Sequence, residues 1–92
     1  MTLSKKQKLA FKSQGHHLKV VVSVGAAGLT DGVMAELELS LNHHELMKIK
    51  IAADDREERR ELIQEICSRL DAELIQSIGH TAVIYRPARD TE

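Results

Sequence analysis

Two hydrophobic periods alternate along the chain, one typical of β-strands and one of amphipathic helices. Residues 18–24 are β-branched and almost continuously apolar, as in a central strand that is covered on at least one face. In residues 46–52 apolar side chains alternate with Lys48 and Lys50. This alternation predicts a strand with one buried and one exposed face.

Two further strands are predicted near the C-terminal end. Residues 73–78 and 81–86 are rich in apolar and β-branched side chains and are separated only by Gly79-His80. So short a connection predicts a β-hairpin. Pro87 should end its second strand, because proline has no backbone N–H for a further ladder bond.

The first two predicted helices differ in character. Residues 3–14 favour a helix by propensity, with a thin apolar face, and Gly15 fits its C-cap. Thr30 is a good N-cap for the next helix, which should end near Asn42. The apolar stripe of this second helix, with Leu29 and Met34 at the spacing of a hydrophobic staple, consists of Leu29, Val33, Met34, Leu37 and Leu41.

A third helix is predicted after Asp54 and Asp55, either of which can cap it. Its buried stripe is expected to be Leu62, Ile63, Ile66, Cys67 and Leu70. Another face mixes glutamates with nearby arginines, a pattern most often found on solvated surface. Because these glutamates would repel a polyanion, we expect the helix to lie away from any nucleic acid.

Together the elements predict one compact α/β domain of order α-β-α-β-α-β-β, with a four-stranded mixed sheet and helices packed mainly on one side. The domain spans residues 1–92, with a core of about 3–86 and a frayed tail over 87–92. The core should be aliphatic, because the chain contains no Trp and only Phe11 and Tyr85 as aromatic residues.

Charge is unevenly distributed, although the net charge is only −1. Residues 1–20 contain five lysines and no acid, so this end of the chain has a positive field. Cys67 is the only cysteine, which favours a reducing compartment. No apolar run approaches the roughly 20 residues of a membrane span, and no signal peptide is evident. We expect a cytoplasmic protein with no membrane partner.

The segment Gly25-Ala26-Ala27-Gly28 lies between the first strand and the second helix. Glycines allow backbone conformations and close approaches that a Cβ would prevent. A loop of this kind before a helix leaves backbone N–H groups free, and phosphate is their common ligand.

Basic residues could extend this loop into a surface for RNA. The candidate binding residues are the loop and its continuation, the lysines and arginine of the strands, and the lysines of the first helix: Gly25, Ala26, Ala27, Gly28, Leu29, Thr30, Lys19, Lys48, Lys50, Arg86, Lys5, Lys6, Lys8 and Lys12. A solvated helix face is the alternative role for the lysines of the first helix. With so few aromatic residues, RNA would be recognised by shape and backbone more than by base stacking.

Metal binding and catalysis are not predicted. The pairs His16-His17 and His43-His44 are adjacent in sequence, and adjacent residues do not share a face of a helix or strand. Cys67 lies on an apolar helix stripe, where a thiol is usually inert. We therefore expect no catalytic residue, no metal, no cofactor and no small-molecule substrate.

Three sequence blocks carry a family resemblance. The runs GHHLKVVVSVGAAGLTDGV, LNHHELMKIKI and IGHTAVIYR resemble the signature blocks of the CRM domain, the chloroplast RNA splicing and ribosome maturation module. The chain is similar to the free-standing bacterial YhbY-like members over about residues 3–86.

The resemblance implies a fold related to the C-terminal domain of translation initiation factor three. It also implies RNA binding through residues 25–28 and the adjoining basic surface, and association with precursors of the large ribosomal subunit. Two positions depart from the family pattern. Ala26 stands where a basic residue is common, which moves more of the attraction to the lysines, and Val20 stands where a proline often precedes the valine run.

The function hypothesis is a non-catalytic, monomeric RNA-binding protein that docks on ribosomal RNA and assists large-subunit assembly. One alternative is a factor for introns or other structured RNAs. A second is a protein-interaction module that docks through the acidic third helix. A third is a small hydrolase that uses His43, His44 and Glu45.

Overall fold

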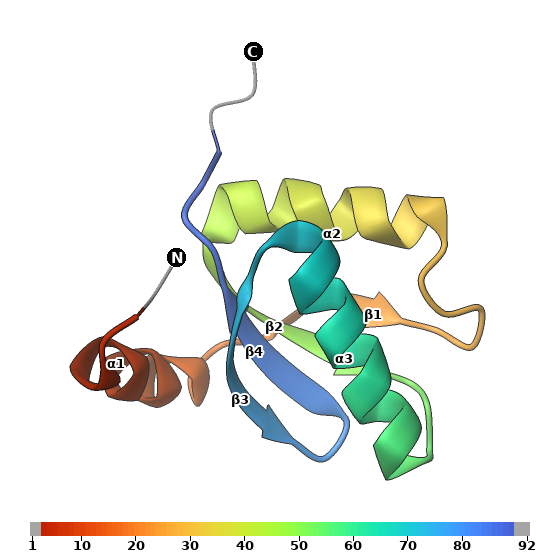
Figure 1. Cartoon of the computed structure of the whole chain (residues 1–92), viewed down its shortest axis with the longest axis horizontal. Helices are drawn as coiled ribbons and strands as arrows, with labels where there is room; N and C mark the ends of the chain where they lie inside the picture. Colours follow the sequence, from red (N-terminus) through yellow and green to blue (C-terminus); the bar gives the residue numbers. More distant parts are fainter. Residues whose placement is uncertain (1–2, 90–92) are drawn as a thin grey trace.

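The computed structural model describes residues 3–89 (Figure 1). Its elements follow the predicted order α-β-α-β-α-β-β. They are α1 (Lys5–Gly15), β1 (Val20–Val24), α2 (Asp31–His44), β2 (Leu46–Ile51), α3 (Arg56–Leu70), β3 (Glu73–Ile78) and β4 (Thr81–Tyr85). The predicted β3–β4 hairpin is confirmed, with Gly79 at φ +57° in its turn.

The four strands form one mixed sheet in the order β1-β2-β4-β3. β1 runs parallel to β2, whereas β4 is antiparallel to both β2 and β3. β1 is therefore an edge strand, and the prediction that it is central is wrong. Only some of its apolar residues face the core. Val22 and Val24 are buried, whereas Val20 and Val21 are exposed where the pairing of β1 with β2 shifts register.

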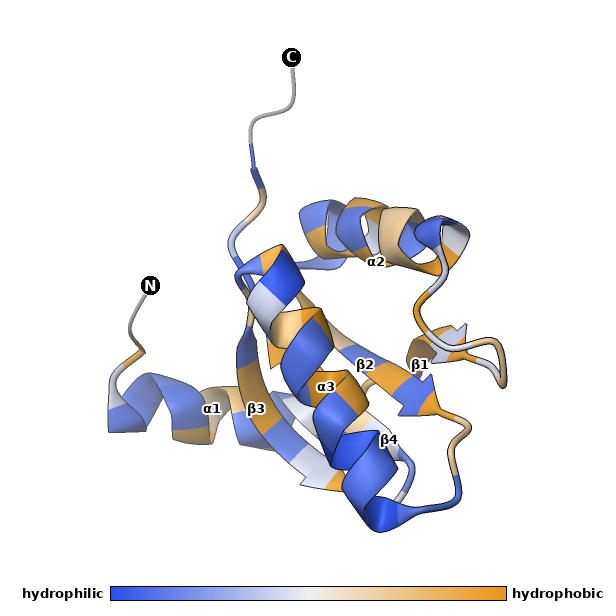
Figure 2. Cartoon of the chain, turned by 45° about the vertical axis from the view of Figure 1, so that its right-hand side comes forward, coloured by the Kyte–Doolittle hydropathy of each residue, from blue (hydrophilic) through white to orange (hydrophobic). Residues whose placement is uncertain are grey.

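Helices α2 and α3 cover one face of the sheet, and their hydrophobic sides turn toward it in Figure 2. The predicted stripes are confirmed, since Met34, Leu37 and Leu41 of α2 are buried against the same core as α3. The contributions of α3 and the strands to this core are Ile63, Ile66, Leu70, Val22, Val24, Met47, Ile49, Ile51, Ala82 and Ile84. The core is aliphatic, as expected.

Local hydrogen bonds fix where the helices begin. Thr30 Oγ1 accepts from the Val33 N–H at 3.2 Å, and Asp55 Oδ2 accepts from the Glu58 N–H at 3.2 Å, as the capping patterns predict. α2 continues to His44, two residues beyond the expected end, and stops at Glu45, whose φ is +63°.

Helix α1 packs on the opposite face of the sheet, where β4 presents Val83 and Tyr85. The rings of Phe11 and Tyr85 stack with centroids 4.4 Å apart. Gly15 is the last residue of α1 and is buried, while His16 is the C-cap, so the predicted capping role of Gly15 is wrong. A Cβ on Gly15 would lie 3.0 Å from Val83 Cγ2, and the glycine thus permits close contact between α1 and β4.

Candidate nucleic-acid interface

The glycine loop, residues 25–30, forms an exposed turn between β1 and α2. The Gly28 N–H donates to the Gly25 carbonyl at 3.0 Å, which closes a four-residue turn. Neither Ala26 nor Ala27 has a positive φ, as in a type I turn, and Gly28 follows at φ +75°. A Cβ at Gly25 or Gly28 would meet nothing within 4 Å, so the loop surface is open to a ligand.

The loop leads directly into the start of α2. The Thr30 side chain caps the helix, and the Thr30 N–H donates to the Gly28 carbonyl at 3.1 Å. The N–H groups of Asp31 and Gly32 belong to the first helical turn, which has no earlier carbonyl partners within the helix. The carboxylate of Asp31 lies in the same turn, so the loop offers backbone donors without a net positive charge.

Positive charge is supplied by β2 on the sheet face opposite α2 and α3. Lys48 and Lys50 alternate with the buried side chains of β2, which confirms the predicted two-faced strand. Lys50 is exposed and aligned with Ser23, one residue before the Val24–Ile51 pair that borders the loop. Lys48 is aligned with Val20, so exposed Lys19 enters the sheet beside Lys48, at the end of β1 far from the loop.

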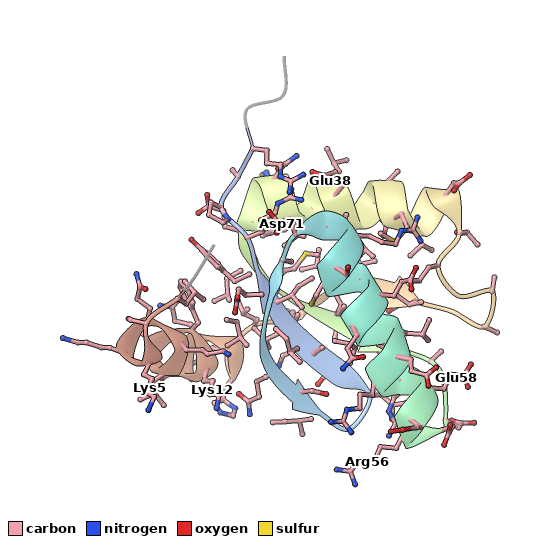
Figure 3. The ribbon with its side chains drawn as sticks, viewed as in Figure 1. Lys5, Lys12, Glu38, Arg56, Glu58 and Asp71 are labelled. Atoms are coloured by element: carbon pink, nitrogen blue, oxygen red, sulfur yellow. The ribbon has the colours of Figure 1, made fainter. Side chains whose placement is uncertain are left out.

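The four lysines of α1 lie elsewhere. Lys5, Lys6 and Lys12 are exposed and Lys8 is half-buried. Figure 1 places α1 and the β1–α2 loop on opposite sides of the molecule, and Figure 3 labels Lys5 and Lys12 on α1, across the molecule from that loop. The lysines of α1 and the glycine loop are therefore two separate parts of the candidate interface.

Arg86 does not lie on the exposed basic surface, and the prediction that it does is wrong. The residue as a whole is 2% exposed. Nη2 donates to Glu38 Oε2 at 2.6 Å and to Asn42 Oδ1 at 2.7 Å, while Nη1 donates to the Leu70 carbonyl at 2.9 Å. Arg86 links the second half of α2 and the last residue of α3 to the end of β4, which is a structural role.

The same network orders part of the predicted tail. The Ala88 N–H donates to Glu45 Oε2 at 2.8 Å, and the Arg89 N–H donates to Asn42 Oδ1 at 3.0 Å. Residues 88 and 89 are thus hydrogen-bonded to the domain, although they belong to the tail that is predicted to fray over residues 87–92. Residues 90–92 of that expected tail lie outside the described part of the chain.

Titration of two side chains is shifted by their surroundings. The hydrogen bonds from Arg86 hold the pKa of the Glu38 carboxyl below its ordinary value of 4.5, against the opposing effect of burial. Burial raises the pKa of the Cys67 thiol to about 11, and the nearby charge of Glu73 adds to the shift. A thiol with so high a pKa is a poor nucleophile at neutral pH.

Other candidate chemistry finds little support in residues 3–89. Within that range no group of three or more His, Cys, Asp or Glu side chains is placed to hold a metal ion. His43 and His44 contact one another edge to face, with ring centroids 4.7 Å apart. No helix in the described range is both long and apolar enough to cross a membrane.

The fold places several side chains next to Lys48 that could not be identified from the sequence. His16, Gln76 and Thr81 line a small hollow together with Lys48 and Ile78. These residues come from the end of α1 and from three strands, so no local motif could have grouped them. The β2–β4 register, which pairs Lys48 with Val83 and Lys50 with Thr81, is the information that was needed.

Comparisons with known proteins give consistent matches. A model of the CRS1/YhbY (CRM) domain family matches residues 3–86. A Pseudomonas aeruginosa protein, named as a probable RNA-binding protein, is 52% identical over 86 residues, covering 94% of this chain and 83% of the relative. A Haemophilus influenzae protein, named as an RNA-binding protein, is 48% identical over 91 residues, covering 99% and 92%.

The fold is also similar to a solved structure. The solution structure of a hypothetical protein from Staphylococcus aureus aligns with a TM-score of 0.83 at 25% identity. The alignment covers 99% of this chain and 95% of that protein. Sequence and structure therefore match known proteins over the same single domain.

Proposed function

Because the chain belongs to the CRS1/YhbY (CRM) domain family, we propose that it is a non-catalytic protein that binds ribosomal RNA in precursors of the large ribosomal subunit. It assists assembly of that subunit in the cytoplasm and acts as a monomer. Its relatives from Pseudomonas aeruginosa and Haemophilus influenzae are named as RNA-binding proteins, which supports RNA as the ligand.

The observation that carries the proposal is the open glycine loop beside Lys50. The loop exposes backbone near Gly25 and Gly28 with no side chain in the way, so a phosphate-sugar backbone can approach closely. Lys50, on the neighbouring strand, supplies the charge that Ala26 does not. The loop fixes the position of the RNA, while lysines of the strands and of α1 provide the attraction.

This division of roles favours recognition of RNA shape. The structure places Phe11 and Tyr85 against each other, so neither ring presents a free stacking platform on both sides. Sequence-specific RNA recognition commonly depends on stacked, unpaired bases. Because each of these two rings covers one face of the other, the proposal places the main contacts on the backbone of a structured RNA.

Gradient sedimentation of cell extract at low salt tests the proposal. The protein should migrate with precursors of the large subunit and leave those fractions as salt rises, because phosphate contacts release counterions. Mature large subunits stripped of precursors are the control and should retain much less protein. Absence of the protein from precursor fractions at low salt would contradict the ribosomal role.

A further inference from the structure

One end of the sheet brings together three segments that are distant in sequence. The Ala52 N–H donates to the Val24 carbonyl at 2.9 Å, just before the glycine loop. The adjacent Ile51 N–H donates to the His80 carbonyl at 2.7 Å, in the β3–β4 turn. The glycine loop, the start of α3 and this turn therefore share the end of the sheet where β1 and β2 finish (Figure 1).

A groove of about 670 Å³ lies at this end, between the first half of α3 and β3. α3 contributes Arg56, Arg59 and Arg60 to its lining, and Glu57 is the one acid there. β3 and its turn contribute Leu74, Ser77 and Gly79. We call this feature the arginine groove.

The arginines of the groove are differently held. Arg59 Nη1 donates to the Ala53 carbonyl at 2.9 Å and to the Asp54 carbonyl at 2.7 Å, which fixes its guanidinium beside the β2–α3 connection. Arg60 lies 3.8 Å from Glu57 in an exposed pair, which contributes little to stability. Within residues 3–89 Arg56 has no ion-pair partner, so Arg56 and Arg60 can turn toward a ligand.

The charges of α3 are sorted by face. Arg56 extends on the side of β3, whereas Glu58 lies on a different side of the helix (Figure 3). Glu58 and Glu61 are exposed and do not line the groove. The run from Asp54 to Glu61 is acidic when summed along the chain, but the surface that it turns to the groove is basic.

We propose that the arginine groove binds the phosphodiester backbone of the same RNA that contacts the glycine loop. The inference rests on the proposed function and extends it, because the RNA then crosses the end of the sheet from the loop to α3. Guanidinium groups form paired hydrogen bonds with phosphate oxygens and suit this ligand. The position of the groove at the same end of the sheet as the glycine loop favours RNA over an acidic peptide as the occupant.

The test compares two double variants that remove equal charge. R56A/R60A removes two arginines from the groove. R69A/R89A removes Arg69 of α3 and Arg89 of the segment after β4, which pair with Glu65 and Asp71. Filter binding with deproteinised precursor RNA of the large subunit gives affinity and its salt dependence. Thermal unfolding shows that each variant is folded.

We expect R56A/R60A to bind about tenfold more weakly, with a salt slope smaller by about 1 to 2, while R69A/R89A stays near wild type. Unchanged RNA affinity of R56A/R60A, or equal losses of affinity in both double variants, would contradict RNA binding by the arginine groove. The wild type would then still bind RNA through other residues. Failure of the wild type to bind this RNA would overturn both proposals. Binding of an acidic polyglutamate peptide to the wild type but not to R56A/R60A, with equal RNA affinities of the two proteins, would assign the groove to a protein instead.

Discussion

The guanidinium of Arg86 binds the carboxylate of Glu38 through two nitrogens, with Nη2 2.6 Å from Oε2 and Nη1 3.1 Å from Oε1. The residues are 48 positions apart, and their pairing joins the end of β4 to the middle of α2. Arg86 is buried, whereas the Glu38 side chain keeps 36% of its surface exposed. The pair stabilises the domain and is not part of the proposed RNA-binding surface.

Replacing Arg86 should therefore affect folding and not RNA contact. Arg86→Ala leaves Glu38, Asn42 and the Leu70 carbonyl without their shared donor, and we expect the free energy of unfolding to fall by about 2 kcal/mol. Urea unfolding measures the loss. RNA affinity, measured where the variant is fully folded, should match the wild type. A variant with wild-type stability but weaker RNA binding would indicate that Arg86 contacts RNA after all.

Stability should depend on pH through Glu38. Because pairing with Arg86 depresses its folded-state pKa, Glu38 contributes stability above its ordinary value of 4.5, and this contribution is lost as pH falls through the folded-state pKa. Urea unfolding between pH 6 and pH 3 should show a smaller change in stability for Glu38→Gln than for the wild type. Equal pH dependence in the two proteins would exclude Glu38 as a source.

The contact between Gly15 and Val83 predicts a steric effect of a single methyl group. Gly15→Ala places a Cβ 3.0 Å from Val83 Cγ2 and should destabilise the protein by about 1 kcal/mol. Gly32→Ala is the matched control, since its Cβ meets only Thr30 Oγ1 at 3.9 Å, and it should be stabilising by about 0.5 kcal/mol. Thermal unfolding compares them. If both glycine variants behave alike, α1 does not depend on close approach to β4.

Lys50 is expected to contact phosphate beside the glycine loop. Lys50→Ala should weaken binding to precursor RNA and reduce the salt slope by about 0.7 to 0.9, the value for one phosphate contact. Arg69→Ala, which removes a charge near the end of α3, is the control and should leave the slope unchanged. If the salt slope of RNA binding is the same for Lys50→Ala and the wild type, Lys50 does not contact a phosphate.

Much of the fold could be predicted because the relevant signals are local. The stripe of α2 and the alternation of β2 each lie within one element, and the Thr30 cap lies next to the helix that it starts. The edge position of β1 could not be predicted in this way, because it depends on which strands pair. A continuous apolar run indicates burial, but the β1 register leaves Val20 and Val21 exposed.

The candidate site was predictable only in part, for a related reason. The glycine loop is one continuous segment, so its position followed from the strand and helix beside it. Arg86 was misplaced because its partners, Glu38, Asn42 and Leu70, come from two helices far away in sequence. The arginine groove could not be predicted, because the run from Asp54 to Glu61 has more acidic than basic residues in sequence although the side of α3 toward β3 is basic.

The affinity of Gly25→Leu for large-subunit precursor RNA tests the central claim most directly. Gly25 has no positive φ and no atom within 4 Å of its Cβ position, so we expect leucine to fit the fold and to obstruct only a ligand. Ser68→Leu, at an exposed position of α3, is the matched control. We expect Gly25→Leu to bind at least about tenfold more weakly, with unchanged thermal stability, and Ser68→Leu to bind like the wild type. Wild-type affinity in Gly25→Leu would contradict RNA binding through the glycine loop.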